Sequence, residues 1–579
     1  MKEQKTFCGP AIWGGIECTI NRIGDEYKDQ LKYSGHYDRA GDIEAIAALG
    51  IQKIRYPILW EKHLPVKDIS IDWRWTDRQL DLIRASGMKP IAGLLHHGSG
   101  PSFTNLLDPA FPYLLASFAY EVASRYPWID EYTPVNEPLT TARFSGLYGL
   151  WFPHHSSEFS FYSMLLNQLK ATVLCMQAIR SVNPSARLIQ TEDLGKTYST
   201  SLLAYQANFE NERRLLTFDI LSGRLKPGHP QYTYILNCGI KEEDVSFFQL
   251  LRTEPDVLGL NFYVTSERWL DERLERYPPE THGGNRTHHY ADTEAVRAEV
   301  DYDGGFKKLA TEIWERYHKP LAVTEVHLHC TREEQLRWFK EILDDSVVLT
   351  NQGIDIQGVT AWALLGSFDW DSLLTKTGTQ YESGVFDIKT FPGVLKPTAL
   401  TTLLKSLSGN KNIFHPVLDA SGWWHMHQKN ENSDSRPLVI LEGADPKFMK
   451  GSNASEIIHS LATACTQRRI AYRILRYVDE NELGKINPWA IVNTGFRGFD
   501  MKSLKLKNSF QYISFDSDET DPTFLRIIAD KMPLSVHQIN KVLDLVIDGD
   551  TGCWIFNSDE IIFKTEEVFH VHVLSDFKL

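Results

Sequence analysis

Two glutamates directly follow residue runs that are typical of β-strands. Glu137 lies in Thr133-Pro-Val-Asn-Glu-Pro138, and Glu325 lies in Ala322-Val-Thr-Glu325. Cleavage of a glycosidic bond requires one acid to protonate the leaving oxygen and one carboxylate to meet the oxocarbenium-like centre. A pair of carboxyls about 5 Å apart gives retention through a covalent glycosyl-enzyme, and a wider pair gives inversion. The two glutamates therefore indicate this chemistry, provided that the fold brings them together.

The elements that must position these glutamates extend to about residue 405, where short apolar runs alternate with longer helical patterns. This alternation predicts a parallel sheet with crossover helices. Eight such runs over roughly 400 residues fit an α/β fold, a closed (β/α)8 TIM barrel, better than an open sheet. We expect strands at residues 11–16, 51–57, 88–96, 131–136, 187–192, 256–263, 320–325 and 356–364, and helices at residues 40–49, 77–86, 112–125, 161–181 and 332–344.

Several of the expected strands end in a polar or charged residue. The carboxyl ends of all strands in a parallel barrel open on one face, and such barrels carry their chemistry there. This pattern predicts a single site at the barrel mouth. The residues concerned are Arg55, His96, Asn136 with Glu137, Glu192, Tyr263 and Glu325.

Seven segments then occur in one order along the chain. They are Trp13-Gly14, Arg55-Tyr-Pro-Ile-Leu-Trp60, Leu95-His96, Asn136-Glu-Pro138, Gly259-Leu-Asn-Phe-Tyr263, Thr324-Glu325 and Trp362-Ala-Leu-Leu-Gly-Ser-Phe-Asp-Trp370. From the second segment on, they resemble the Arg-x-Ser-x-x-Trp, Leu-x-His-Trp, Thr-x-Asn-Glu-Pro, Gly-x-Asn-Tyr-Tyr, Thr-Glu-Asn-Gly and Trp-Ser-Leu-x-Asp-Asn-Phe-Glu-Trp motifs of glycoside hydrolase family 1. The first resembles the opening motif of that family. The resemblance to these β-glucosidase-like enzymes covers about residues 8–405.

The resemblance implies a retaining β-glycosidase and assigns roles to five residues. Glu137 is the implied acid/base and Glu325 the implied nucleophile. Asn136 is implied to hold the sugar 2-hydroxyl, a contact that strengthens in the transition state. Tyr263 is implied to donate to the nucleophile, and Arg55 to keep it ionised. The resemblance implies neither a metal ion nor an organic cofactor.

Five further residues are implied to bind the sugar. His96 is expected to bind a ring hydroxyl, and Trp362 and Trp370 to form an apolar floor and wall. Asn21 stands where the family uses a glutamine for the 3- and 4-hydroxyls, and Asp369 stands where it uses a glutamate. Shorter side chains at these two positions do not reach the same sugar hydroxyls, so buried polar groups stay unpaired unless the ligand differs in shape. We therefore expect a β-glycoside or oligosaccharide whose glycone is not plain glucose.

Composition restricts the partners. The chain of 579 residues has a net charge of −14, so phosphates of nucleic acids or anionic membranes would not be neutralised. The seven cysteines lack metal-ligand spacing and predict a reducing compartment without disulfides. No apolar signal core or run of 18 apolar residues is visible, which predicts a cytoplasmic protein.

Other polar clusters have less specific interpretations. His96-His97 and His154-His155 are neighbours in sequence, so on a strand their side chains point to opposite faces and a shared metal ion is not expected. Residues 282–290 form a loop-like insertion, either part of an aglycone wall or simply solvated. Glu192 and Asp193 are expected to bind a sugar hydroxyl or pair with an arginine.

The composition changes near residue 428. We expect a barrel domain at residues 1–427, a polar linker at 428–435 and a smaller Rossmann-like α/β domain at 436–579. Residues 488–493 and 542–554 resemble the reductases that make dTDP-rhamnose. A dinucleotide site needs a glycine-rich strand–helix turn, but residues 442–451 hold acidic residues and a proline there, and no Tyr-x-x-x-Lys pair is present. The domain is therefore interpreted as a degenerate remnant, with barrel packing, homo-oligomerisation and shaping of the site entrance all left open.

Three other functions remain open at this point. A transglycosylase would use the same two glutamates with a different acceptor. A sugar-binding protein without turnover would explain the altered glycone residues, although both carboxyls are retained. A bifunctional enzyme with a working nucleotide-sugar reductase is disfavoured by the absent glycine loop.

Overall fold

The computed structural model describes residues 9–298, 300–390, 393–409, 415–425, 436–442, 453–475, 479–494, 504–515, 521, 523–529, 534–556 and 561–564. The chain divides into two compact units. The first consists of Met1–His329, Trp338–Lys396 and Leu404–Lys411, and the second of Cys330–Arg337, Pro397–Leu403 and Asn412–Leu579. Among the described residues, none of the helices combines the length and the apolar character needed to span a bilayer.

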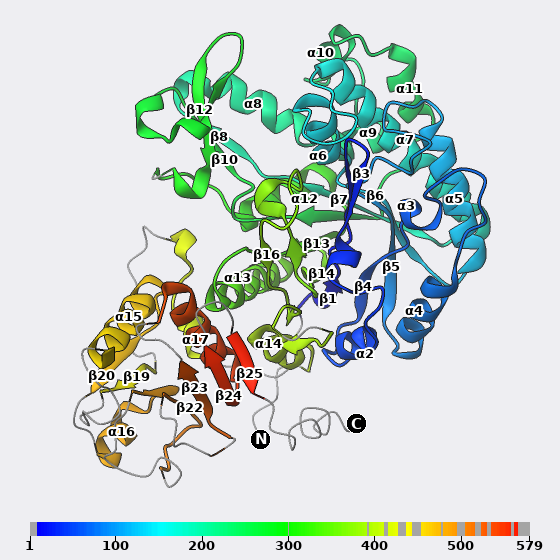
Figure 1. Cartoon of the computed structure of the whole chain (residues 1–579). Coiled ribbons are helices and arrows are strands. Elements are labelled where there is room, and N and C mark those ends of the chain that lie inside the picture. Colours follow the sequence, from blue (N-terminus) through cyan, green and yellow to red (C-terminus); the bar gives the residue numbers. More distant parts are fainter. Residues whose placement is uncertain are drawn as a thin grey trace. The chain divides into compact units, whose positions relative to one another are not determined.

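A closed parallel barrel forms the centre of the first unit (Figure 1), with strand order β1-β14-β13-β9-β7-β6-β5-β4. This confirms the predicted barrel, and every expected strand is present within a few residues of its predicted ends. The strands are β1 (Ala11–Gly15), β4 (Lys53–Pro57), β5 (Lys89–His96), β6 (Glu131–Asn136), β7 (Arg187–Asp193), β9 (Val257–Asn261), β13 (Leu321–Val326) and β14 (Ile356–Ala361).

Parallel barrel strands are buried on both faces, which explains their nearly continuous apolar runs. All six residues of β6 are buried. Five buried residues from five strands form one cluster: Trp13, Ile91, Ile189, Val257 and Ala322. Side chains therefore fill the barrel, and the residues at its strand ends are held on a packed base.

Helices connect the strands, and their apolar residues recur at helical spacing. In α5 (Phe111–Arg125) the buried residues include Phe111, Leu115, Phe118 and Val122, which share one face. The other long helices are α4 (Arg74–Ala85), α7 (Glu158–Val182), α8 (Ala204–Arg213), α11 (Glu242–Leu250), α12 (Phe306–Tyr317), α13 (Arg332–Asn351) and α14 (Ala399–Ser408). Shorter ones are α1 (Gln30–Tyr33), α2 (Asp42–Ala47), α3 (Trp60–His63), α6 (Pro138–Ala142), α9 (Leu216–Leu221) and α10 (Tyr232–Asn237).

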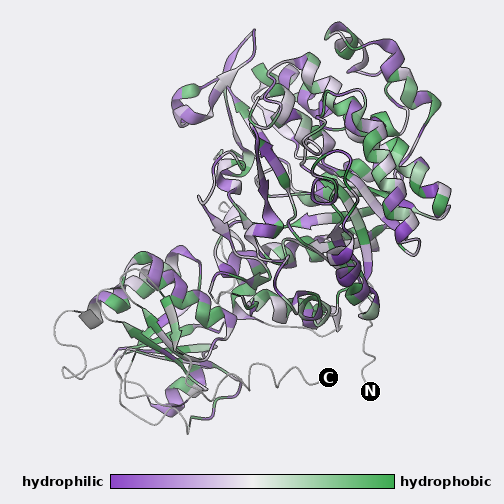
Figure 2. Cartoon of the chain, turned by 45° about the vertical axis from the view of Figure 1, so that its right-hand side comes forward, coloured by the Kyte–Doolittle hydropathy of each residue, from purple (hydrophilic) through white to green (hydrophobic). Residues whose placement is uncertain are grey.

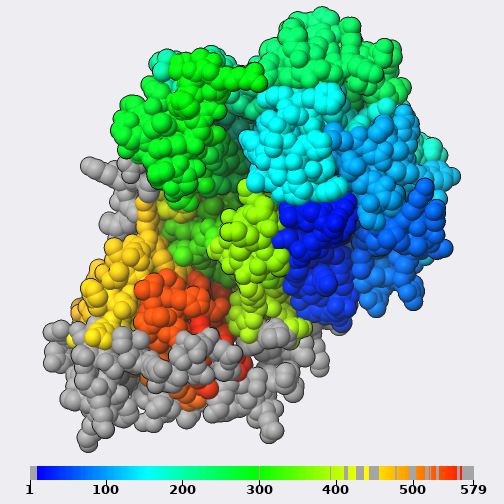
Figure 3. All heavy atoms as spheres, turned by 45° about the horizontal axis from the view of Figure 1, so that its top comes forward, coloured from blue at the N-terminus to red at the C-terminus, as the bar shows by residue number. Residues whose placement is uncertain are grey.

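A four-stranded sheet is inserted around β9, with strand order β11-β12-β10-β8. Its strands are β8 (Thr197–Ser199), β10 (Arg268–Asp271), β11 (His282–Gly284) and β12 (His289–Glu294). Residues 282–290, expected as a loop, form a hairpin instead, because Asn285 donates its backbone N–H to the His288 carbonyl at 2.9 Å and Gly284 adopts φ 148°. In Figure 3 the green lobe of this region stands beside a cyan segment, and the surface between them is hollowed.

Three two-stranded pairs are also present among the described residues. They are β2 (Ile20–Ile23) with β3 (Glu26–Asp29), β15 (Ser367–Phe368) with β16 (Tyr381–Glu382), and β17 (Phe386–Asp387) with β18 (Lys396–Pro397).

The second unit contains a seven-stranded sheet in its described residues, in the order β20-β19-β21-β22-β23-β24-β25. All neighbouring strands are parallel except β24 and β25. The strands are hydrophobic (green in Figure 2). They are β19 (Leu438–Leu441), β20 (Tyr472–Leu475), β21 (Ala490–Asn493), β22 (Gln511–Ser514), β23 (Leu525–Ala529), β24 (Gly552–Phe556) and β25 (Ile561–Lys564), with helices α15 (Asn453–Gln467), α16 (Glu480–Ile486) and α17 (Val536–Asp548).

The second unit is thus α/β, as the sequence predicted. The expected linker at 428–435 lies outside the described residues, and so does the segment at 442–451 apart from its first residue.

Candidate active site

Glu137 directly follows β6 and is the N-cap of the short helix α6. Its backbone is left-handed, with φ 44° and ψ 61°, a conformation that is costly for residues other than glycine and is found at functional positions. Pro138 suits the first helical position because its missing N–H would have no partner there. Glu192, at the end of β7, accepts the backbone N–H of Leu139 at 2.9 Å. The turn that carries Glu137 is therefore fixed by the neighbouring strand.

Glu325 lies in β13, and hydrogen bonds hold both of its carboxyl oxygens. Arg55 donates from Nη1 to Oε1 at 2.8 Å, and the Tyr263 hydroxyl donates to Oε2 at 2.5 Å. The same guanidinium donates from Nη2 to Oδ1 of Asn136 at 2.7 Å. The structure thus brings together four residues that the sequence placed on separate strands and loops.

A second set of hydrogen bonds joins Glu137 to the residue that precedes Glu325 on β13. Asn261, which pairs with Glu325 across β9 and β13, donates from Nδ2 to Oε1 of Glu137 at 2.5 Å. Its Oδ1 accepts the Thr324 hydroxyl at 2.6 Å. Asn261 and Thr324 both lie within the motifs found in the sequence, but the sequence alone assigned them no role. Their contacts orient the Glu137 carboxyl relative to the strand that carries Glu325.

The two carboxyls also interact through their charges. Burial raises the pKa of Glu137 well above its usual value, and the charge of Glu325 raises it further, followed by those of Glu192 and Asp193. Burial also raises the pKa of Glu325, although Arg55 opposes this shift. Arg55 therefore acts in the predicted direction but is outweighed by burial. Like charges disfavour ionisation of both carboxyls, but only Glu325 has a neighbouring guanidinium that opposes the shift, so the pKa of Glu137 is the more strongly raised.

Aromatic rings lie beside these carboxyls. His96 stacks on Trp362 with ring centroids 5.6 Å apart and planes at 11°, and the Arg55 guanidinium lies 4.7 Å from the Trp362 ring centre. Asn136 Nδ2 is 3.3 Å from His96 Nε2. Burial lowers the pKa of His96 well below 6.5, so its ring is neutral. Trp370 packs edge-on against His97, with ring centroids 5.5 Å apart.

Asn21 and Asp369 stand where the family has longer side chains, and their surroundings differ from each other. Asn21 is buried on β2, and its Nδ2 has no hydrogen-bond partner among the described residues. Asp369 uses both oxygens within its own loop, accepting the backbone N–H of Thr379 at 2.7 Å and of Gly378 at 3.0 Å. A sugar hydroxyl bound to Asp369 would therefore share the carboxylate with these two backbone N–H groups.

Two buried side chains of the site were missed by sequence reasoning. His97 Nε2 lies 3.7 Å from Glu137 Oε2. The signal was available, because the Leu-x-His-Trp motif expects tryptophan at this position. Glu17 follows β1, and its pKa is raised to about 7, chiefly by burial and also by the charge of Glu325. Glu17 directly follows the expected strand at residues 11–16, so the strand-end pattern that singled out Glu137 and Glu325 was also present here.

The remaining polar clusters have other partners. His154 Nε2 accepts the Gly24 N–H at 2.9 Å, and His155 Nδ1 contacts the Ser160 hydroxyl at 3.0 Å. Within the part of the chain that the structure describes, no three His, Cys, Asp or Glu side chains are grouped so that they could hold a metal ion.

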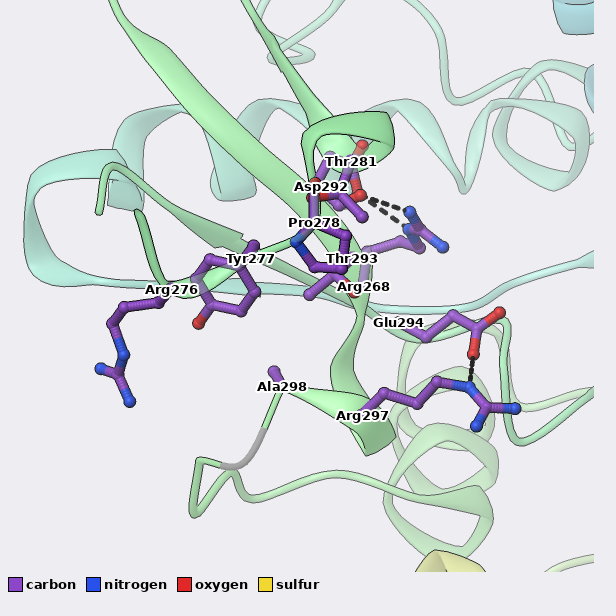
Figure 4. Close-up of a pocket in the computed structure, with 10 residues that line it drawn as sticks. All are labelled: Arg268, Arg276, Tyr277, Pro278, Thr281, Asp292, Thr293, Glu294, Arg297 and Ala298. Atoms are coloured by element: carbon purple, nitrogen blue, oxygen red, sulfur yellow. Dashed lines mark hydrogen bonds and ion pairs between the residues drawn. The ribbon is translucent and has the colours of Figure 1, made fainter. Parts of the chain in front are cut away.

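An open pocket of about 500 Å³ lies along the inserted sheet (Figure 4). Two arginines of its lining are paired within it, since Arg268 donates to Asp292 at 2.8 Å and Arg297 pairs with Glu294. The lining of this pocket shares no residue with the Glu137 and Glu325 site.

The barrel and its two carboxyls define a glycosidase-type site, and comparison with known families agrees. The model of glycosyl hydrolase family 1 matches residues 8–381, so the chain belongs to this family.

Individual relatives share the fold at low identity. Beta-glucosidase 1B of Phanerodontia chrysosporium is 28% identical over 131 residues, which cover 17% of this chain and 24% of that relative. The β-glucosidase of Thermotoga maritima in complex with cyclophellitol matches with a TM-score of 0.56 at 16% identity, over 71% of this chain and all of the other. The AHE enzyme of Alicyclobacillus herbarius matches with a TM-score of 0.55 at 16% identity, over 66% of this chain and 88% of the other.

Proposed function

We propose that the chain is a retaining β-glycosidase with Glu325 as nucleophile and Glu137 as acid/base. The observation that carries this proposal is the unequal environment of the two carboxyls. Glu325 receives donors from Arg55 and Tyr263, whereas Glu137 receives one amide donor and faces the negative charge of Glu325. Such a difference assigns one carboxyl to proton donation and the other to attack.

In the first step, the Glu325 carboxylate attacks the anomeric carbon while Glu137 gives its proton to the leaving oxygen. The bond to the aglycone breaks, and a covalent glycosyl ester forms on Glu325. Asn136 is assigned to the sugar 2-hydroxyl. Arg55 donates to its Oδ1 at 2.7 Å, so Nδ2 is its donor atom, which without a sugar lies 3.3 Å from His96 Nε2 and 3.4 Å from His97 Nε2.

In the second step, Glu137 takes a proton from water, and the resulting hydroxide attacks the anomeric carbon and releases Glu325. The ester removes the negative charge of Glu325, which is the second largest cause of the raised pKa of Glu137. The pKa of Glu137 therefore falls in the intermediate, and the same group becomes a base.

We infer that the glycone differs from plain glucose. The unpartnered Nδ2 of Asn21 and the committed carboxylate of Asp369 support this inference. Both positions offer less reach than the family's longer side chains, so a substituted or differently shaped sugar fits better.

We propose that the second unit performs no hydride chemistry. Two polar residues at its described strand ends are used internally. Asn493 donates to the Tyr512 hydroxyl at 2.7 Å, and Thr494 donates to the Leu441 carbonyl at 2.8 Å.

A panel of nitrophenyl β-glycosides tests the proposed activity, and we expect release of nitrophenol from at least one of them. For a variant of Glu137, the matched control is Glu131→Gln. Glu131 lies at the opposite end of β6 and is bonded to Lys53 at 2.7 Å. This control should lower stability and leave turnover in the folded enzyme. Release from no member of the panel, with binding retained, would favour a sugar-binding protein instead.

A further inference from the structure

Thr191 of β7 is a buried residue that contacts the candidate active site. None of its surface is exposed, at 0%. Its hydroxyl oxygen lies 2.7 Å from Oδ1 of Asn136, the residue assigned to the sugar 2-hydroxyl. A buried hydroxyl is normally hydrogen-bonded, and here its partner is a side chain of the site.

The contacts of the Asn136 side-chain oxygen fix the direction of its amide. Arg55 carries only donors, so the atom that its Nη2 contacts at 2.7 Å is Oδ1. Because Oδ1 is an acceptor, the Thr191 hydroxyl donates to it. A carbonyl oxygen has two lone pairs, and these two donors occupy both. The orientation of the amide is therefore determined by donors from two different strands, β4 and β7.

The nitrogen end of the same amide is held less tightly. Nδ2 lies 3.3 Å from His96 Nε2 and 3.4 Å from His97 Nε2, both at the long end of hydrogen-bond distances. Burial lowers the pKa of His96 well below 6.5 and that of His97 to about 3, so both rings are neutral and able to accept. The amide is thus fixed at its oxygen by two short bonds, and its nitrogen has only long contacts to exchange for a ligand hydroxyl.

The neighbouring strand fixes the rotamer of Thr191. Gly259 of β9 is paired with Thr191 in the sheet. A Cβ at Gly259 would lie 2.8 Å from the Thr191 methyl carbon, a distance that real Cβ atoms essentially never show. The methyl therefore occupies space that the glycine leaves free. Since the methyl and the hydroxyl share one Cβ, this packing also fixes the direction of the hydroxyl toward Asn136.

We propose, on the basis of the proposed glycosidase function, that Thr191 is a positioning residue that acts through Asn136. Together with Arg55 it holds Oδ1, so that Nδ2 meets the sugar 2-hydroxyl, a contact that strengthens in the transition state. Without the Thr191 hydroxyl, one lone pair of Oδ1 would be buried without a partner, and the amide oxygen would keep a single donor.

The test compares Thr191→Val, which replaces the hydroxyl by a methyl, with Thr191→Ser, which retains the hydroxyl. The readout is the ratio of kcat/KM for a cleaved glycoside of the nitrophenyl panel to kcat/KM for its 2-deoxy analogue. In Thr191→Val we expect this ratio to fall by about 3- to 10-fold, the size of one neutral hydrogen bond, chiefly through kcat of the 2-hydroxy substrate. In Thr191→Ser most of the ratio should be restored.

A matched control separates positioning from packing. Thr133 is also buried on a barrel strand, β6, and its hydroxyl donates to the Ile189 carbonyl at 2.8 Å. Thr133→Val should lower Tm and leave the ratio unchanged, because a loss of packing affects the 2-hydroxy and 2-deoxy substrates alike. An equal fall of the ratio in Thr133→Val and Thr191→Val would overturn the proposal.

Rotation about the Cγ–Nδ2 bond of Asn136 gives a readout that needs no turnover. Donors to an amide oxygen strengthen the double-bond character of its C–N bond, so the loss of one donor should speed the exchange of the two Nδ2 protons. NMR of protein labelled with 15N-asparagine measures this exchange, and the Asn136 signals are those that Asn136→Asp removes.

Faster exchange in Thr191→Val than in wild type and Thr133→Val supports the proposal even if no glycoside of the panel is cleaved, an outcome that would reject only the glycosidase function. Equal exchange rates in folded wild type and folded Thr191→Val would overturn it. So would an unchanged ratio in a Thr191→Val enzyme that retains activity.

Discussion

The mouth of the barrel and the carboxyl edge of the second sheet are built from parallel strands, yet they are used differently. The barrel strands end in charged side chains that meet, such as Arg55 on β4 and Glu325 on β13 at 2.8 Å. In the second unit β19 ends at Leu441 and β20 at Leu475, and Asn493 on β21 is bonded within the sheet. A shared topology therefore provides a place for a site, and the side chains at the strand ends decide whether chemistry follows.

Charge in the second unit serves its stability. Arg468 is 5% exposed and pairs with Glu333 and with Asp544, the latter at 2.7 Å. All three residues belong to the second unit and lie on or next to helices. Removal of one partner from a buried ion pair is strongly destabilising because it leaves the other charge unpaired, whereas the barrel mouth keeps like charges close and raises their pKa values.

The largest effect on activity is expected from Glu325→Gln. Removal of the nucleophile should lower kcat by about 10⁴-fold or more. Burst kinetics and mass spectrometry should show a glycosyl ester in wild type and none in the variant. Wild-type rates in Glu325→Gln would break the assignment of the barrel mouth as the reactive region.

A smaller loss is expected from Glu137→Ala. Removal of the general acid should lower kcat/KM for poor leaving groups by about 10² to 10⁴-fold. Added azide should restore cleavage of activated glycosides and give a β-glycosyl azide, detectable by NMR. An α-azide product would contradict the retaining mechanism.

Tyr263→Phe tests the hydrogen bond to the nucleophile. Loss of a bond to a charged group costs about 1.5 to 3 kcal/mol, or roughly 10- to 100-fold in rate. The hydroxyl lowers the pKa of Glu325, so its loss should raise that pKa and move the acidic limb of the pH profile to higher pH. A pH profile measured from acid to neutral conditions checks the sign, and a shift to lower pH would contradict it.

Arg468→Met in the second unit should leave kcat/KM of the folded enzyme unchanged and lower the free energy of unfolding by about 3 to 5 kcal/mol, because Glu333 loses its partner. Denaturant titration measures the change. The exposed Arg473→Met on β20 is the matched control, with an expected change within about 0.5 kcal/mol. Loss of turnover in folded Arg468→Met would show that the two regions are not separable in function.

The smallest effect is expected for NADPH. The sequence at 442–451 has acidic residues and a proline in place of the glycine-rich pattern that a pyrophosphate site requires. Isothermal titration of the full chain should therefore show no binding heat. A saturable heat would assign the second unit a ligand after all.

Sequence reasoning was most accurate where a residue's surroundings follow from its own strand. Residues 131–136 were predicted as a strand and form β6 with the same bounds. It was less accurate for the insertion at 282–290, where a turn at Asn285 builds a hairpin, and it gave Glu17 and His97 no role in the site. Those residues owe their properties to neighbours that are distant in the chain, such as Glu325 for Glu17.

The sequence by itself determined the alternation of strands and helices, the family motifs and the two glutamates, because periodicity and residue type are local properties. Only the tertiary structure decided that burial and the charge of Glu325 raise the pKa of Glu137, that Asp369 is committed to a turn, and that His97 lies beside Glu137. The physical reason is that burial, charge proximity and hydrogen-bond direction depend on atoms that chain closure brings together from different strands.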